Sequence, residues 1–207
     1  MKSAIEIALI IFALLLCQSC HEKKHLLTKE GEIISKLQDD KTQSEKFRKS
    51  AGVLLDVLEE KENIKIRDYL NAKREISSVR SLATAQAWIA LLEFNEKKLP
   101  DSLPSAEEMD MEEKKNNENQ TTDIYYSTTI RLSLINSSIS ALSYLDMPEA
   151  KSAMESFLQR FEKKYGDSSG GRKMLKKYRL ERSQHEEDTR RGLAPWQTGL
   201  KVGDGVS

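Results

Sequence analysis

Apolar residues recur every three or four positions along most of the chain, which is the spacing that places them on one face of an α-helix. The longest stripe runs from Ala72 to Phe94 at successive intervals of 4, 3, 4, 4, 3 and 4 residues. It predicts one long helix that stops before Pro100, because the residue before a proline is pushed out of the helical conformation. Shorter stripes predict further helices within 44–58, 132–142 and 150–165.

These stripes predict an all-α fold, a helical hairpin or bundle of about four to five helices. We expect 72–94 to pack mainly against 132–142 and 150–161, because narrow apolar stripes are buried against each other. The segment Asp146–Glu149 predicts a helix start in which the Asp146 side chain caps the first turn. Gly166 is a natural place for that helix to end.

Residues 100–123 carry the opposite signal, with few apolar positions and a strong acidic bias. They predict an acidic disordered loop, since acidic runs are usually solvated. The acidic residues between positions 101 and 118 outnumber the two lysines there, Lys114 and Lys115. They are Asp101, Glu107, Glu108, Asp110, Glu112, Glu113 and Glu118.

The N-terminal apolar run, residues 7–17, is too short to cross a membrane. It has 11 residues and follows Glu6, whereas a spanning helix needs about 20. One basic residue, a short apolar core and a polar end are typical of a removable secretory signal. A helix of the folded core is the alternative, but such a helix normally shows a polar stripe, and this run shows none.

The only two cysteines, Cys17 and Cys20, lie where this apolar run ends. The segment resembles a bacterial lipoprotein signal, in which the residue after the cut is a cysteine that is acylated on sulfur. Ser19 is the small residue that this pattern requires before the cysteine, while Cys17 and Gln18 depart from it. The resemblance implies cleavage between Ser19 and Cys20, lipidation of Cys20 and attachment to a membrane through its acyl chains.

The same resemblance bears on location. An Asp directly after the cysteine favours the inner membrane in that family, and His21 stands there instead. We therefore expect a lipid-anchored protein of the bacterial cell envelope, at the outer membrane rather than the inner one. The alternative is a secreted protein cut at the same bond.

These boundaries divide the chain into four parts. We predict a lipoprotein signal peptide at 1–19, and a tether with the start of the first helix at 20–43. The helical domain is expected at 44–190, with its loop at 100–123, and a flexible tail at 191–207.

The chain has 33 basic and 33 acidic residues, and zero net charge argues against a nucleic-acid partner. The charge is nevertheless uneven, because residues 160–182 are strongly basic, and a basic helix expected from about Gly171 to Arg191 overlaps this segment. This face is either solvated or docked on anionic lipid, lipopolysaccharide or an acidic protein surface. The acidic segment 101–118 is a candidate partner, within one molecule or between two. The possible interaction surface is Arg172, Lys173, Lys176, Lys177 and Arg179.

Motifs for catalysis or metal binding are weak. Cys20, His21 and His25 have spacings that could hold a metal, but Cys20 is the expected lipid site. His185 has Thr189 where a zinc-binding helix would need its second histidine. We predict no catalytic, cofactor or metal residues.

The sequence therefore favours a non-enzymatic envelope lipoprotein that serves as a scaffold or accessory component, for example of a secretion, conjugation or assembly system. Its expected partners are the membrane and an envelope protein. A surface-exposed host-interaction or antigenic lipoprotein is the alternative. An enzyme with a site built from dispersed residues is the third hypothesis.

Overall fold

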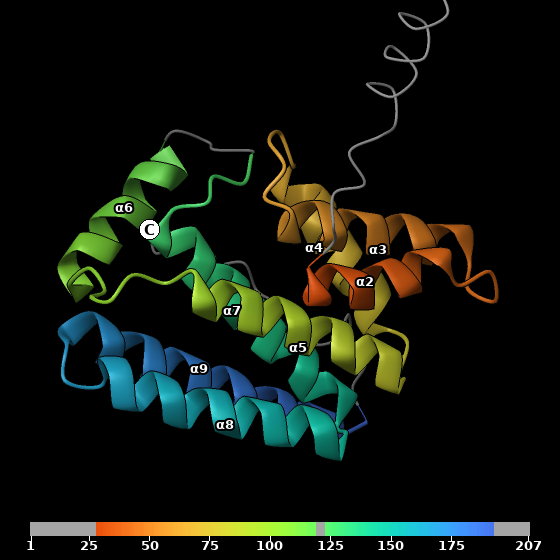
Figure 1. Ribbon diagram of the computed structural model, residues 1–207. Coiled ribbons are helices and arrows are strands. Elements are labelled where there is room, and N and C mark those ends of the chain that lie inside the picture. The colour runs from red at the N-terminus through yellow and green to blue at the C-terminus, as the bar shows by residue number, and fades with distance from the viewer. Residues whose placement is uncertain (1–27, 119–122, 193–207) are drawn as a thin grey trace, which may run out of the picture.

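The fold was obtained as a computed structural model, which describes residues 28–118 and 123–192 (Figure 1). This part of the chain is all-α, as predicted. It contains eight helices rather than four to five: α2 (Lys29–Asp39), α3 (Glu45–Leu58), α4 (Ile66–Ser77), α5 (Leu82–Lys97), α6 (Ala106–Glu118), α7 (Thr128–Leu145), α8 (Pro148–Tyr165) and α9 (Ser169–Arg190).

The long helix predicted over 72–94 is two helices. α4 ends at Ser77 and α5 begins at Leu82. Ser81 takes an extended conformation and its hydroxyl accepts a hydrogen bond from the Thr84 amide at 3.1 Å, so it is the N-cap of a new helix. The apolar spacing continues in phase across the break, so the apolar pattern alone does not reveal that there are two helices.

An extra helix also lies within the segment predicted as tether and first helix start, 20–43. Thr28 caps α2 by accepting from the Gly31 amide at 3.1 Å. Ile34 and Leu37 are buried in the core. The packed part of the protein therefore begins earlier than the sequence predicted.

The prediction of a disordered loop over 100–123 is wrong for α6. Ser105 and Glu108 form a reciprocal capping box, in which the Glu108 amide donates to Ser105 Oγ at 3.2 Å and the Ser105 amide donates to Glu108 Oε2 at 2.7 Å. Glu107 and Glu108 in the first turn and Lys115 in the last turn also suit the helix dipole. These local interactions form a helix from a segment with few apolar residues.

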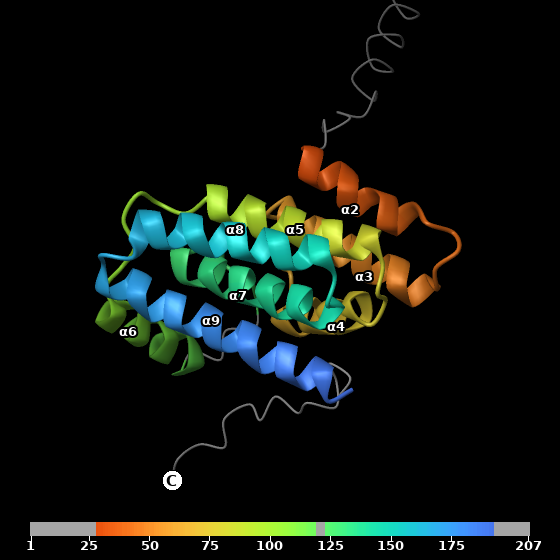
Figure 2. The same ribbon diagram turned by 90° about the horizontal axis from the view of Figure 1, so that it is seen from below.

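α7 lies at the centre of the bundle, in contact with α4, α5, α8 and α9 (Figure 2). α5 packs on α7 and α8, as predicted for the 72–94 stripe, and also on α2. α4 differs, because its main partner is α3. α6 lies at one end of the bundle, against α9 and the start of α7.

The turn between α7 and α8 corrects the predicted cap. Asp146 is the C-cap of α7 in a left-handed conformation with φ 50°, which Asp tolerates better than most residues. Its carboxylate pairs with Lys151 at 2.6 Å. The N-cap of α8 is Met147, without a side-chain hydrogen bond, and Pro148 occupies the first turn as predicted. The predicted end of this helix at Gly166 is confirmed.

Backbone contacts join the segments that precede α4 and α7. Ile124 donates its amide to the Ile64 carbonyl at 2.8 Å, beside a single antiparallel bridge between Lys65 and Asp123. Within 28–118 and 123–192, none of the helices is both long enough and apolar enough to cross a membrane.

Candidate functional site

The predicted basic surface on α9 is divided between two sides of the helix. Met174, Leu175 and Tyr178 are buried on the face toward the bundle. Lys173 and Lys177 lie on the side toward α6, where both line a pocket. Arg179 lies on the opposite side and pairs with Glu162 of α8 at 2.7 Å.

The remaining two residues of that surface do not join either group. Arg172 donates to the Asp167 carbonyl at 2.7 Å, so it closes the turn between α8 and α9. Lys176 is exposed. The structure therefore brings together Lys173 and Lys177 only, and the five residues do not form one patch.

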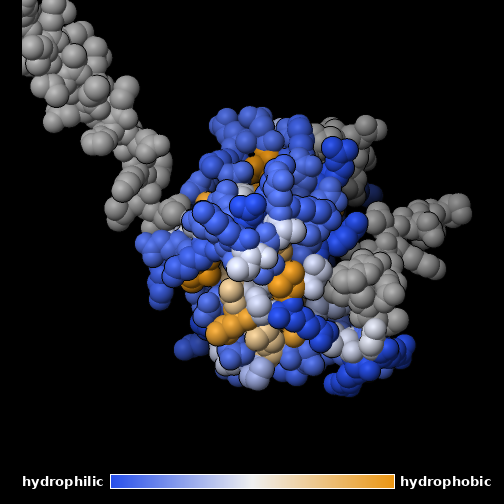
Figure 3. Space-filling model, turned by 90° about the vertical axis from the view of Figure 1, so that its right-hand side faces the viewer, coloured by the Kyte–Doolittle hydropathy of each residue, from blue (hydrophilic) through white to orange (hydrophobic). Residues whose placement is uncertain are grey.

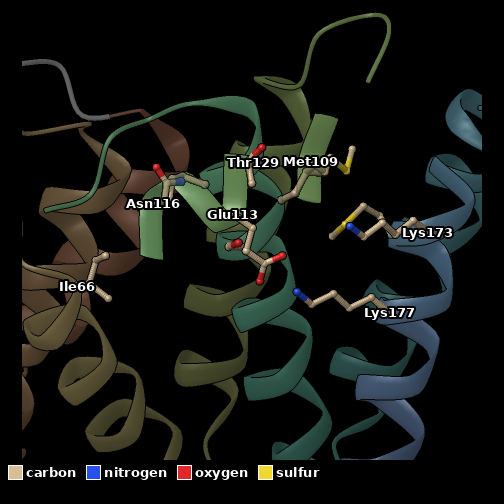
Figure 4. Close-up of a pocket in the computed structure, with 11 residues that line it drawn as sticks. Ile66, Met109, Glu113, Asn116, Thr129, Lys173 and Lys177 are labelled. Carbon is tan, nitrogen blue, oxygen red and sulfur yellow. The ribbon is translucent and has the colours of Figure 1, made fainter. Parts of the chain in front are cut away.

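The pocket has a volume of about 190 Å³ and lies between α6, α7, α9 and the first turn of α4 (Figure 4). Both lysines reach its mouth from α9, and Glu113 and Asn116 reach it from α6. In Figure 4 the charged ends of Glu113 and Lys177 point toward one another across the mouth. The apolar part of the lining is Ile66, Met109, Ile130, Leu132 and Met174.

The acidic segment is a partner of the basic helix within this molecule. Lys173 Nζ lies 2.5 Å from Asp110 Oδ1 and also donates to the Ala106 carbonyl at 3.4 Å. At the end of α8, Lys164 pairs with Asp101 at 3.3 Å. The expectation that 101–118 meets the basic surface is confirmed for contacts within one chain.

A second polar cluster, which the sequence analysis missed, lies between α7 and α9. His185 is buried, and its Nε2 lies 2.9 Å from Ser140 Oγ and 2.7 Å from Glu181 Oε1. Its other ring nitrogen, Nδ1, lies 3.8 Å from Asp188 Oδ2, and neither of these buried atoms has a hydrogen-bond partner among the described residues. The spacing of 181, 185 and 188 by four and three residues places them on one face of a helix, which is the signal that could have revealed them.

Charges around this cluster are coupled to Lys73 of α4. Burial raises the pKa of the Glu181 carboxyl, but hydrogen bonds from His185 and Ser140 and the charge of Lys73 outweigh it and leave that pKa below its usual value. Burial lowers the pKa of Lys73, and Glu181 opposes that shift. The cluster therefore joins three helices through charge as well as through packing.

The geometry of this cluster differs from that of a hydrolytic triad. A triad needs the serine on one ring nitrogen and the carboxylate on the other, whereas Ser140 and Glu181 meet the same nitrogen of His185. Ser140 is also only 2% exposed. In this structure the cluster connects α7 to α9.

The described residues contain no group of three His, Cys, Asp or Glu side chains suited to hold a metal ion. Ser19, Cys20, His21 and His25 lie outside the described residues. On the side of the molecule that Figure 3 shows, apolar residues form small patches among charged ones. The pocket beside α6 therefore remains the candidate site, because it combines an apolar lining with convergent charges.

No protein-family model matches the chain, and comparisons with curated proteins and with solved structures find no significant similarity.

Proposed function

We propose that this protein is a lipid-anchored component of the bacterial cell envelope that acts as a non-enzymatic scaffold or accessory by binding another envelope protein. The observation that carries the proposal is the sequence around Cys20. A short apolar run ends at Cys17, Ser19-Cys20 comes soon after it, and charged residues begin at Glu22. Each buried methylene of an acyl chain contributes about 0.8 kcal/mol, so two or more chains hold a protein on a bilayer.

The start of α2 supports an arrangement close to the membrane. Thr28, the cap of α2, lies eight positions after Cys20. An extended chain spans at most roughly 3.5 Å per residue, so Thr28 stays within about 30 Å of the lipidated cysteine. An anchor on Cys20 therefore keeps the bundle near the bilayer surface, where it meets other envelope proteins.

The pocket and its lysines supply the partner-binding part of the proposal. Lys177 is exposed on α9 and stands with Lys173 at the mouth of the apolar pocket. An acidic protein surface complements this region better than a neutral one. His21, in the position that follows Cys20, favours the outer membrane as the location of this encounter.

Metabolic labelling with a palmitate analogue tests the anchor. We expect the Cys20→Ala variant to lose both label and processing, and to stay out of the membrane fraction as a mature form. The Cys17→Ala variant is the matched control and should be labelled and processed normally, because Cys17 is removed with the signal. Label that survives in Cys20→Ala would refute the anchor at Cys20. Loss of label in Cys17→Ala would instead assign the lipid to Cys17.

A further inference from the structure

α6 is the least buried helix of the described part of the chain. Among residues 106–116, Met109 alone is buried, while Met111 is 63% exposed. Every other helix described here buries at least three residues. α6 is therefore attached to the bundle with little apolar contact.

Polar contacts supply most of what holds α6 in place. Asp110 pairs with Lys173 of α9, and both side chains are partly or largely exposed. Glu112 accepts hydrogen bonds from Ser127 at 2.9 Å and from Thr129 at 2.5 Å, at the start of α7. The Asp110–Lys173 pair is a surface contact, which salt screens and which stabilises weakly, whereas the Glu112 hydrogen bonds are partly buried.

The interface beneath α6 is also incompletely filled. The pocket of about 190 Å³ lies between α6 and the α7–α9 surface and has an apolar lining (Figure 4). The pocket opens to solvent at its mouth, so α6 does not cover this apolar lining completely. A helix that leaves such a space under itself fits this surface less closely than a dedicated core element does.

The connection before α6 is held against the bundle. Tyr165 Oη donates to the Pro100 carbonyl at 2.6 Å. At Gly170, an added Cβ would lie 2.0 Å from the Pro104 carbonyl oxygen, so this segment rests directly on the backbone of α9. Leu103 is buried beside it. Residues 100–104 are therefore anchored to the bundle ahead of α6.

We infer that α6 is a displaceable cover over a helix-binding groove between α7 and α9, and that the groove's partner is an acidic amphipathic helix of another protein. This inference rests on the proposed partner-binding function and names the partner class. The floor of the groove is Ile130, Leu132 and Met174, and its rim carries Lys173 and Lys177.

The chemistry of α6 itself defines what the groove accepts. α6 has six acidic and two basic residues, and Met109, the one buried residue among 106–116, stands between Glu108 and Asp110. A competing helix must offer the same features, a large flexible apolar side chain flanked by carboxylates, because binding grooves for helices select apolar anchors and complementary charge. Displacement occurs when such a helix makes more of these contacts than α6 does.

Methionine oxidation by hydrogen peroxide measures whether the cover opens, in the full chain as purified from bacteria. Met174 and Met109 are 5% and 3% exposed, Met111 is 63% exposed, and Met154 is fully buried in the core. Asp110→Lys places two positive charges together, and we expect hydrogen peroxide to oxidise Met174 at least fivefold faster in this variant. The rate at Met154 should stay unchanged, which shows that the bundle is folded.

The charge-swapped double variant Asp110→Lys with Lys173→Asp is the matched control. It restores the ion pair in reverse, and we expect Met174 to regain slow oxidation. Should Asp110→Lys accelerate Met154 as well, Asp110→Asn removes the pair without adding charge and takes its place. An unchanged rate of Met174 oxidation in both Asp110→Lys and Asp110→Asn would overturn the inference.

A synthetic peptide of residues 104–118 then tests the partner class. At millimolar concentration, it should slow oxidation of Met174 severalfold in the opened variant and have less effect on the wild type, whose own α6 competes. The same peptide carrying Met109→Ser is the control and should not protect. Failure of the first peptide, or equal protection by both, would overturn the acidic amphipathic helix as occupant.

These measurements are separable from the test of the anchor. Oxidation rates at Met174 do not depend on whether Cys20 carries lipid, and palmitate labelling does not depend on α6. A chain with an unlabelled Cys20 and a displaceable α6 would refute the proposed location and leave the groove in place. A labelled Cys20 together with an α6 that is not displaced would refute the groove and leave the proposed anchor in place.

Discussion

α6 lies at one end of the bundle against the start of the central helix α7, and the two helices are stabilised in different ways. α7 buries 12 of its 18 residues and is apolar on nearly every side, so its position follows from packing. α6 forms through the Ser105–Glu108 capping box and buries Met109 alone among residues 106–116. α7 is held in place by its neighbours, whereas α6 is stabilised by local interactions and has few buried contacts with the bundle.

The difference shows that forming a helix and fixing a helix in place are separate matters. Caps and dipole effects stabilise a turn without specifying where the helix packs. Apolar burial specifies both, because a stripe must meet another apolar surface. Changes to α7 should therefore affect global stability, whereas changes to α6 should affect local opening.

The largest expected effect comes from placing a charge inside α7. Ile139 is fully buried, and Ile139→Asp should lower the free energy of unfolding by about 4 kcal/mol or more, since an unpaired charge in a core is strongly unfavourable. Thermal unfolding followed by circular dichroism measures this. Met111→Asp on α6 is the matched control and should change stability by less than about 0.5 kcal/mol. Equal effects at the two sites would remove the distinction between the helices.

A smaller effect is expected where the start of α7 is tied to the turn after α3. Arg131 is 8% exposed, pairs with Glu60 and lies over the Tyr126 ring with its guanidinium carbon 5.6 Å from the ring centroid. Burial raises the pKa of Glu60, but the pairing with Arg131 and Lys98 outweighs it and leaves that pKa below its usual 4.5. Glu60→Gln should cost about 1 to 2 kcal/mol at pH 7.

The sign of the pH dependence follows from the lowered pKa. A carboxylate with a depressed pKa in the folded state contributes stability above its unfolded pKa and loses it as the pH falls through the folded value. The difference in unfolding free energy between wild type and Glu60→Gln should therefore shrink from pH 7 to pH 3. Urea unfolding of both proteins at several pH values checks this, and a gap that widens on acidification would contradict it.

The same two helices show what the sequence could and could not predict. The apolar spacing placed α7 and α8 because burial leaves a periodic signal in the residues themselves. The acidic composition of α6 predicts a loop, whereas the Ser105–Glu108 pair forms a capping box that starts a helix. The interruption before Leu82 was missed because the stripe stays in phase across it.

The candidate site was less predictable than the fold. Lys173 and Lys177 were recognised as basic residues, but their position beside Met109 and Glu113 depends on how α6 docks on α9. Charge pattern alone does not tell which side of a helix meets which neighbour. The cluster of Ser140 and His185 likewise depends on the contact between α7 and α9, which lie far apart in the sequence.

Removing one helix cap from each type of helix gives an effect of about 1 kcal/mol that should appear in different measurements. Ser81→Ala removes the cap of the core helix α5, so it should lower the global free energy of unfolding by about that amount. Ser105→Ala removes the cap of α6 and should speed amide exchange within α6 severalfold, with global stability nearly unchanged. A global loss from Ser105→Ala as large as that from Ser81→Ala would show that α6 unfolds together with the core.

The smallest effect, and the most direct comparison of the two helices, is their response to salt. The contact between Asp110 and Lys173 is at the surface, with side chains 67% and 31% exposed. At 0.5 M salt the screening length falls to roughly 4 Å, so this pair loses most of its attraction and α6 should open more often. Amide exchange within α6 should rise about two- to fivefold between 0.05 and 0.5 M sodium chloride, while α7 amides keep their protection because apolar burial holds them. The double variant Asp110→Lys with Lys173→Asp should respond like the wild type, and Asp110→Asn should respond less. An α6 whose exchange is independent of salt would mean that Met109 and the Glu112 hydrogen bonds hold it without help from the ion pair.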